Sequence, residues 1–303
     1  MLDRLEFLIA LAREKHFGRA AAACGVAQPT LSIGIQNLEE MFKVPLVKRS
    51  SRFKGFTPEG ERVLLWAQRL VGDAQAMREE ILSLQTGGGA HIRIASIPFA
   101  MLIVSRLTMP FQERHPRARF TVLARTSDMV VDLLHQREVD AGITYLDNDP
   151  VGEVIKLPLY RDKFMLLTRG DGALGQRKGV SWPDIAPLPL CLFTRDMQLR
   201  RMIDNVLRGQ KLELVPQIET DSASALVSHV RTGRWVSVVP LSMIQSLQPP
   251  EDLRAIPVVE PEVAHTIGLV VSERFAIQPA IVSLMEEARA LCPPELAGAV
   301  APA

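Results

Sequence analysis

Residues 17–56 constrain the fold more than any other part of the chain, because they contain two short helical patterns joined by a tight turn. The first pattern holds four successive alanines, Ala20–Ala23, which suit a helix that packs very close to a neighbour. Gly25 can adopt the left-handed conformation that ends a helix without penalty. The second pattern begins near Gln28, and Pro29 stands in the first turn, where proline is tolerated. These features predict a helix-turn-helix.

A further helix is predicted over residues 2–14, because apolar side chains recur there at helical spacing. Its stripe consists of Leu5, Leu8, Ile9 and Ala12. We expect Gly18 to break the chain before the alanine helix. In the helix that follows Gln28, the predicted buried face consists of Leu31, Ile35, Leu38 and Phe42.

The opposite face of this second helix carries short polar or small side chains that can approach base edges in a DNA groove. Glutamine and asparagine can pair with adenine. Gly34 is expected on this outward face, and the candidate readers are Gln28, Pro29, Thr30, Ser32, Ile33 and Asn37. A plain three-helix bundle that binds nothing is the alternative, and the basic loop that follows favours DNA binding.

That loop, residues 44–56, has short strand-like arms and is interpreted as a wing. The net charge of the chain is only +1, but residues 43–54 carry a local run of cations without an acid: Lys43, Lys48, Arg49, Arg52 and Lys54. We expect Arg49, Arg52 and Lys54 to reach phosphates or the minor groove. Arg19 and Lys48 complete the candidate DNA-binding set.

A long helix is predicted over residues 58–85, with Thr57 as its cap and Pro58 at its first position. Its heptad stripe consists of Val63, Ala67, Leu70, Ala74, Met77, Ile81 and Leu84. Such a stripe can be intramolecular core or an oligomer seam. Because the helix is long and lies between domains, we favour a dimer seam, formed by Val63, Leu70, Met77, Ile81 and Leu84. Gly87–Gly89 are interpreted as a flexible hinge.

From His91 onward, short apolar strand patterns alternate with helical ones, which implies an α/β fold with a parallel sheet. The predicted strands are 92–95, 120–124, 141–144, 164–168, 188–193, 214–219, 235–239 and 266–271, and the predicted helices are 99–115, 128–137, 197–208, 223–232 and 279–291.

Several of these segments resemble the LysR-type transcriptional regulators. The resemblance is carried by residues 27–32 (AQPTLS), 38–40 (LEE), 44–49 (VPLVKR) and 57–60 (TPEG), and more loosely by 139–143 and 233–240. Ala27 stands where the family usually has serine. The resemblance implies an N-terminal all-α winged helix-turn-helix with a linker helix, followed by a periplasmic-binding-protein-like α/β effector domain of two Rossmann-like subdomains.

The implied boundaries are 1–57 for DNA binding, 58–90 for linker and hinge, and 91–303 for regulation. The regulatory part would divide into subdomain I, residues 91–162 with 268–303, and subdomain II, residues 163–267. The resemblance also implies a homodimer or homotetramer, contact with RNA polymerase, and a small effector whose binding changes the bending of double-stranded DNA.

Small ligands bind beyond the carboxyl ends of strands in such folds. The residues at those ends are the candidate effector set: Ser96, Ile97, Pro98, Phe99, Thr126, Ser127, Thr144, Thr194, Arg195 and Ser222. Hydroxyl groups and helix N-termini favour a small anion, and Arg195 could pair with a carboxylate.

Other classes of protein are disfavoured. Charges interrupt the N-terminal apolar run, no apolar run approaches a membrane span, and three scattered cysteines predict free thiols in the cytoplasm. No metal, cofactor or enzyme motif is predicted; the GxGxxG sequence at residues 170–175 precedes a loop rather than a helix. The remaining alternative is a ligand-binding or transport protein whose N-terminal helices merely dimerise.

Overall fold

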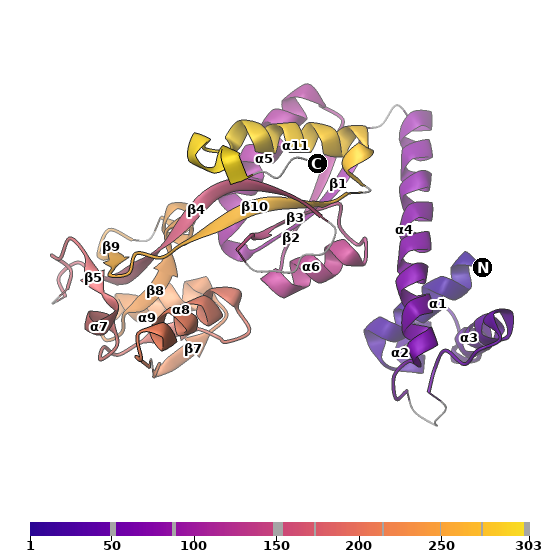
Figure 1. Ribbon diagram of the computed structural model, residues 1–303, viewed down its shortest axis with the longest axis horizontal. Helices are drawn as coiled ribbons and strands as arrows, with labels where there is room; N and C mark the ends of the chain where they lie inside the picture. Colours follow the sequence, from indigo (N-terminus) through magenta and orange to yellow (C-terminus); the bar gives the residue numbers. More distant parts are fainter. Residues whose placement is uncertain are drawn as a thin grey trace. The chain divides into compact units, whose positions relative to one another are not determined.

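The computed structural model describes residues 1–48, 53–86, 89–147, 154–172, 174–213, 215–248, 250–273 and 275–299 (Figure 1). The chain forms two compact units. The N-terminal unit contains Met1–Ala90, with which His135–Glu138 are grouped, and the C-terminal unit contains His91–Leu134 and the residues from Val139 onward. Each unit is described by itself.

The N-terminal unit is built from helices α1 (Leu2–Glu14), α2 (Phe17–Ala23), α3 (Gln28–Phe42) and α4 (Pro58–Thr86). The predicted bounds of α1 are confirmed. The expectation that Gly18 precedes α2 is wrong, because the Nδ1 atom of His16 accepts hydrogen bonds from the backbone N–H groups of Gly18 (3.1 Å) and Arg19 (3.3 Å) and so caps the helix two residues earlier. Gly25 has φ of +67°, as its role in ending the helix requires.

The core of the N-terminal unit lies between the four helices and the root of the wing. Gly34 is part of it, since a Cβ atom at this position would lie 2.5 Å from the ring of Phe7 on α1. The close crossing of α1 and α3 therefore needs glycine, which corrects the prediction that Gly34 faces outward. Phe42 is 43% exposed rather than buried, because α3 ends there, and Lys43 turns the chain with φ of +56°.

Helix α4 starts at a tight contact with the root of the wing. Thr57 caps it as predicted: its Oγ1 accepts the N–H of Gly60 at 2.9 Å and donates to the carbonyl of Pro45 at 2.6 Å. A Cβ atom on Gly60 would lie 2.0 Å from the carbonyl oxygen of Leu46. Glycine at position 60 therefore allows the helix to lie against the wing.

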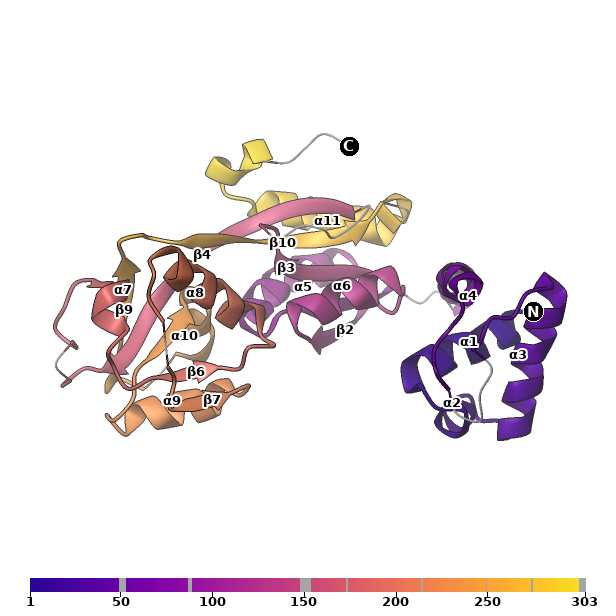
Figure 2. The same cartoon turned by 60° about the horizontal axis from the view of Figure 1, so that its bottom comes forward.

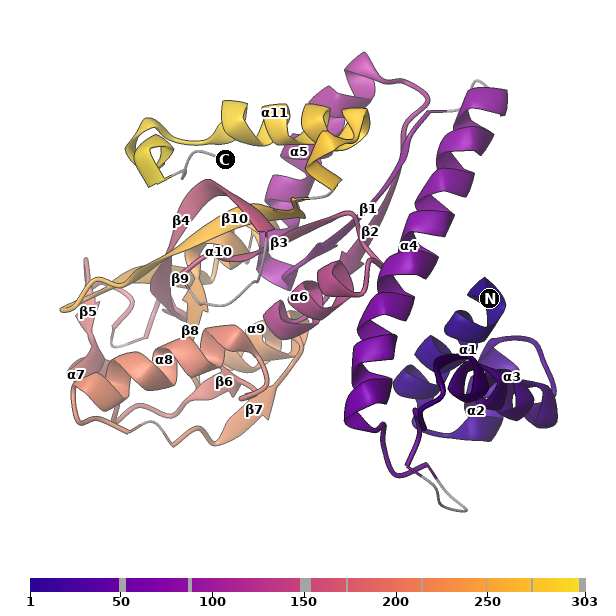
Figure 3. The ribbon, with the colours of Figure 1, turned by 45° about the vertical axis from the view of Figure 1, so that its right-hand side comes forward.

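The first turns of α4 pack on α1, and the remainder of the helix extends beyond them (Figure 3). Ala67 and Val71 are buried, and Val63 is partly buried against the same core, so Val63 offers less surface to a partner helix; its place in a dimer seam stays a prediction. The stripe that is exposed instead consists of Trp66, Leu70, Met77 and Ile81, each 42–56% exposed. The side chain of Leu84 and two glycines of the predicted hinge, at positions 87 and 88, lie outside the described residues.

In the C-terminal unit the structure confirms the alternation of strands and helices, with some elements added. The strands are β1 (His91–Ser96), β2 (Arg119–Ala124), β3 (Ala141–Tyr145), β4 (Val154–Arg169), β5 (Val180–Ser181), β6 (Cys191–Phe193), β7 (Ile218–Thr220), β8 (Ser237–Pro240), β9 (Leu253–Val259) and β10 (Ala264–Ser272). The helices are η1 (Pro98–Ala100), α5 (Met101–Arg114), α6 (Ser127–His135), α7 (Trp182–Ile185), α8 (Gln198–Gly209), α9 (Ala223–Arg231), α10 (Leu241–Leu247), η2 (Phe275–Ile277), α11 (Pro279–Leu291) and η3 (Pro294–Ala299).

The sheet is mixed, whereas the sequence predicted a parallel one. The order of its strands is β2-β1-β3-β10-β4-β9-β5, and β8 also pairs with β4. Strands β1, β2 and β3 are parallel, but β10 is antiparallel to both β3 and β4. The reason is that two strands run between the halves of the unit and connect them. The first of them, β4, was only partly predicted, and Leu214, where one strand was predicted to begin, lies outside the described residues.

Strands β4 and β10 join two α/β groups. The β1 group contains β1–β3, with α5 and α11 on one face and α6 on the other (Figures 1 and 3). The β6 group contains β6 and β7 with α8 and α9 beside them, and the strands β8 and β9 (Figure 2). Strand β4 pairs with β10 up to Lys163 and with β8 and β9 from Phe164 onward, so the crossing lies between these two residues.

The Gly60→Ala variant should lower the free energy of unfolding of the N-terminal unit by about 1–3 kcal/mol, the cost of overpacking, because the added methyl group overlaps the Leu46 carbonyl. Urea denaturation measures this. The matched control is Gly209→Ala, where nothing lies within 4 Å of the added methyl group. Equal stability of the two variants would show that α4 does not depend on the close contact.

Candidate DNA-binding surface and effector crevice

The outward face of α3 carries most of the predicted base readers. Gln28, Pro29, Thr30 and Ile33 are exposed, and Ser32 and Asn37 are half-buried. Gln36 was not predicted from the sequence, although it is exposed three residues after Ile33 and so shares its face. Helical spacing from Ile33 would have found it. The surface that α3 offers is therefore apolar at Ile33 and polar on both sides of it.

The root of the wing is a short antiparallel pairing. Val47 and Phe56 form a bridge, and the N–H of Lys48 donates to the carbonyl of Gly55 at 3.1 Å. Phe53 packs edge-on against Phe56, with ring centroids 5.1 Å apart, and against a phenylalanine of α2. The predicted contacts Arg49 and Arg52 lie between these arms, outside the described residues.

A carboxylate holds the root of the wing to α3. The Oε1 atom of Glu39 accepts the backbone N–H groups of Leu46 (2.7 Å) and Val47 (3.0 Å). Hydrogen bonds to a charged acceptor are about twice as strong as neutral ones. Glu39 therefore fixes the wing relative to the base-reading face, although it is not among the candidate readers. This role was not predicted from the sequence.

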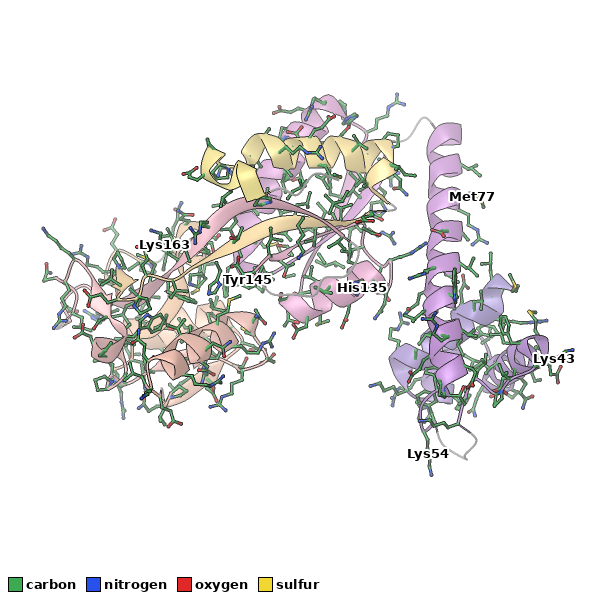
Figure 4. The ribbon with its side chains drawn as sticks, in the orientation of Figure 1. Lys43, Lys54, Met77, His135, Tyr145 and Lys163 are labelled. Carbon is green, nitrogen blue, oxygen red and sulfur yellow. The ribbon has the colours of Figure 1, made fainter. Side chains whose placement is uncertain are left out.

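Three predicted DNA-binding cations, Arg19, Lys48 and Lys54, lie among the described residues and are exposed. Lys48 and Lys54 stand on the two arms of the wing, and Lys54 projects away from the helices (Figure 4). Arg19 lies on α2 with its side chain 64% exposed, beside Glu14. Phosphate oxygens are the usual partners of such exposed cations on a DNA-binding surface.

The C-terminal unit contains a crevice between the β1 group and the β6 group. It holds a cavity of about 20 Å³, enough for roughly one water molecule. Residues from the start of three helices line it: Ile97, Pro98 and Phe99 at η1, Thr126 and Ser127 at α6, and Met197, Gln198 and Leu199 at α8, together with Tyr145. Helix N-termini present free N–H groups and partial positive charge.

The structure brings five predicted effector residues to this crevice and leaves the others outside its lining. Ile97, Pro98, Phe99, Thr126 and Ser127 line it. Thr144 lies buried beneath, with its Oγ1 atom 2.6 Å from the Oγ of Ser127. Those that do not line the cavity are Ser96, Thr194, Arg195 and Ser222.

Four lining residues were not predicted from the sequence, namely Tyr145, Met197, Gln198 and Leu199. The last three stand at the start of a helix that was predicted, so its N-terminus was the available signal. The floor of the crevice includes an aromatic contact between the groups, with the rings of Phe99 and Phe193 5.1 Å apart.

A polar cluster lies beside the crevice where β4 crosses. Asp162 accepts hydrogen bonds from the N–H (3.1 Å) and the hydroxyl (2.5 Å) of Ser242, at the start of α10. Burial raises the pKa of Asp162, although the Ser242 hydrogen bonds and the charge of His265 oppose the shift. Figure 4 shows Tyr145 between the two groups. Burial, and next the charge of Asp162, raise the pKa of Tyr145 far above its usual value, so its phenol stays protonated.

Features of other protein classes do not come together in the part of the chain that the structure describes. There, no cluster of three or more metal-ligating side chains occurs, and no helix is long and apolar enough to cross a membrane. The described residues of the GxGxxG sequence form a turn after β4, and the next helix, α7, begins only at Trp182. A phosphate-binding loop requires a helix directly after the glycines.

Comparison with known proteins identifies the family. Residues 2–61 match the model described as "Bacterial regulatory helix-turn-helix protein, lysR family", and residues 85–293 match the LysR substrate binding domain. The chain therefore belongs to the LysR family of DNA-binding transcriptional regulators, and is not an enzyme. The expected fold class is confirmed.

Individual relatives are distant. The chain is 26% identical to a probable nitrogen assimilation transcriptional activator of Synechocystis over 80% of its length and 79% of the relative. It is 25% identical to the regulator OxyR of Escherichia coli over 94% of each chain. Among solved structures, a full-length OxyR variant of Pseudomonas aeruginosa shares 25% identity with a TM-score of 0.69, covering 95% and 94% of the two chains. CbnR, at 18% identity and a TM-score of 0.67 over 97% and 99%, supports the fold alone.

The raised pKa of Asp162 gives a pH dependence with a defined sign. The folded protein holds this proton more tightly than the unfolded chain, so the wild type should gain stability relative to Asp162→Asn as the pH falls from 7 toward 4. Urea denaturation of both proteins across this range measures the relative gain.

Asp171→Asn is the control for this measurement. The hydrogen bond from Arg169 lowers the pKa of Asp171, so removal of this carboxylate should change the pH dependence in the opposite direction. If Asp162→Asn and the wild type had the same pH dependence, Asp162 would not carry the raised pKa.

Proposed function

We propose that this protein is a homo-oligomeric transcriptional regulator whose binding or bending of its operator is controlled by a small anionic effector in the crevice. The observation that carries the first half is the exposed face of α3, held by Glu39 to a wing root that bears Lys48 and Lys54. The crevice lined by three helix N-termini carries the second half.

On the DNA, α3 enters the major groove with Gln28 and Thr30 near base edges and Ile33 against a thymine methyl group. Arg19, Lys48 and Lys54 contact phosphates, and the residues between the arms of the wing, including Arg49 and Arg52, contact the backbone or the minor groove. Because the exposed side chain of Ile33 is apolar and cannot form a hydrogen bond to a base, we infer that methyl contact and DNA shape contribute to the recognition beside hydrogen bonds.

The effector site is proposed from the chemistry of the crevice, because the relatives are named for different responses, nitrogen assimilation and hydrogen peroxide induction. N–H groups at the start of α6 and α8 and the hydroxyls of Thr126 and Ser127 favour an anion. Phe99, Met197 and Leu199 supply an apolar wall. A cavity of about 20 Å³ is too small for most metabolites, so the two groups must separate to admit one.

Peroxide sensing, named for some relatives, is not proposed for this chain. The reactive form of cysteine is the thiolate. Burial raises the pKa of Cys191 to about 11, and burial also raises the pKa of Cys24 and Cys292. These thiols are therefore protonated at neutral pH.

The assembly is proposed to form through the exposed stripe of α4, which is Trp66, Leu70, Met77 and Ile81. A contiguous apolar stripe of this kind on a helix suits a partner helix. Pairing places two copies of α3 on successive half-sites. A tetramer that also contacts RNA polymerase is the form we propose in the cell.

A mobility-shift titration against DNA from upstream of the protein's own gene tests DNA binding. The complex should weaken steeply as salt rises, because phosphate contacts release counterions. Lys54→Ala should weaken binding and reduce the slope of log K against log salt by about 1. The matched control is Lys178→Ala, an exposed lysine of the C-terminal unit.

If the DNA is not retarded at any protein concentration, the result favours the alternative, a ligand-binding protein whose N-terminal helices only dimerise. If Lys54→Ala left the salt slope unchanged, the proposed contact of the wing with a phosphate would be wrong, and the proposed role of α3 would be unaffected.

Met77→Glu should break the assembly, because it places a charge in the middle of an apolar seam. The side chain of Met77 is 56% exposed in the single chain and is therefore available to a partner helix. Sedimentation velocity should show a species of lower mass, and operator affinity should fall about tenfold or more as two half-sites become one. The matched control is Arg78→Glu at the next exposed position, which lies off the stripe. If the variant at position 77 kept the mass of the wild type, α4 would not be the seam.

A further inference from the structure

An ion pair crosses the mouth of the crevice. Nη2 of Arg201 on α8, in the β6 group, lies 3.0 and 2.9 Å from the two carboxylate oxygens of Asp128 on α6, in the β1 group. The side chains are 34% and 68% exposed, so the pair is in contact with solvent. It is a polar link between two groups that must separate if the crevice is to open.

The guanidinium group of Arg201 is held at the rim of the crevice by its own group. Its Nε donates to Oε1 of Gln198 at 2.9 Å, an acceptor that Nη2 shares, and its Nη1 donates to the carbonyl of Asp196 at 2.8 Å. Gln198 lines the cavity. These two acceptors hold the guanidinium so that the second N–H of Nη2 points toward the β1 group. This orientation does not depend on the hydrogen bond to Asp128.

Asp128 reaches the rim from the opposite side. It follows Ser127, which lines the cavity, in the first turn of α6. Its carboxylate is thus an anion placed beside the N-terminus of α6 and against the guanidinium of Arg201. These are the two kinds of group that we propose for recognition of the effector.

Neither neighbouring arginine can take this role. Arg195 is exposed, and among the described residues no side-chain hydrogen bond or ion pair fixes its guanidinium as Gln198 and Asp196 fix that of Arg201. Arg200 is fully buried, and its guanidinium donates to Asp204, Glu219 and the carbonyl of Phe193 within the β6 group. Only Arg201, of the three, combines a fixed orientation at the rim with a partner that can be exchanged.

We propose that Arg201 is the residue that binds the negative charge of the effector, and that Asp128 competes with the effector for this guanidinium. This inference rests on the proposed anionic effector and names the residue that recognises it. An entering carboxylate takes the Nη2 donor of Arg201 and releases Asp128, and with it the polar link across the mouth. A neutral molecule of the same shape cannot make this exchange.

The ion pair between Arg201 and Asp128 is weak enough for a ligand carboxylate to replace Asp128. Exposed ion pairs contribute little to stability and are screened by salt. A ligand carboxylate can therefore displace Asp128 with its own charge, while the other contacts of the crevice supply the affinity. A fully buried pair would be too costly to break. Competition with Asp128 lowers the apparent affinity of Arg201 for a carboxylate, so an effector must bind more tightly than Asp128 does.

Hydrogen–deuterium exchange on the full-length protein without ligand tests the link. Asp128→Asn and Arg201→Gln should each speed exchange about two- to fivefold, the range expected for an exposed pair, in segments 97–101, 127–131 and 197–202. Strand β10 should not change. The double variant Asp128→Arg with Arg201→Asp, which restores an ion pair of reversed order, should return exchange to the wild-type rate. Asp132→Asn, an exposed acid one turn along α6, is the matched control.

A second measurement tests recognition of charge. Acetate, succinate and benzoate are each titrated beside the neutral amide of the same acid, with thermal stability as the readout. At least one carboxylate should stabilise Asp128→Asn at a concentration about two- to fivefold lower than the wild type requires. Arg201→Gln and the reversed double variant should lose this response, and Arg208→Gln, farther along α8, should keep it.

The outcomes separate the two proposals. If a carboxylate stabilises the wild type and Asp128→Asn equally, or if exchange rates do not change, the assignment of Arg201 and Asp128 is overturned and the anionic effector stands. If no carboxylate acts on Asp128→Asn, or if amides act as well as acids, the anionic effector itself is overturned. DNA binding is unaffected by either result.

Discussion

The regulatory half of this protein depends on the two strands, β4 and β10, that run without interruption between its α/β groups. Strand β4 pairs with β10 up to Lys163 and with β8 from Phe164 onward, so this one strand takes part in the pairing of both groups. Opening of the crevice, as proposed above, would change the aromatic contact of Phe99 with Phe193 and the rim ion pair.

The DNA-binding half is built on the opposite principle, since its parts are fixed to one another. Gly34 lets α3 lie against Phe7 of α1, and Gly60 lets α4 lie against the carbonyl of Leu46. Glu39 then ties the wing root to α3. Three close contacts thus leave the reading face, the wing and the start of α4 as one body. In the assembly proposed above, these contacts would couple the arrangement of two α4 helices to the position of each α3.

Local patterns predicted the parts of the fold that local forces determine. The bounds of α1 follow from helical periodicity, and the helix-turn-helix follows from Gly25 and the first-turn proline. Periodicity does not say which neighbour a stripe meets, so it could not show that Val63 also packs against the unit's own core. Most of β4 escaped prediction because it crosses between two groups, and Pro158, Arg161 and Asp162 interrupt the alternation there.

The difference between local patterns and tertiary contacts also explains which residues of the crevice could be predicted. Residues that end strands or begin helices, such as Thr126 and Ser127, could be found because parallel strands place them at one edge. Arg201 could not, because its role comes from facing an acid 73 positions away on a different group. Arg195 stood nearer to a predicted strand end, yet the helical turns that follow it decide which guanidinium reaches the rim. Charge recognition at such a site is therefore a property of how two groups meet, and the residue that performs it is visible only once both are folded.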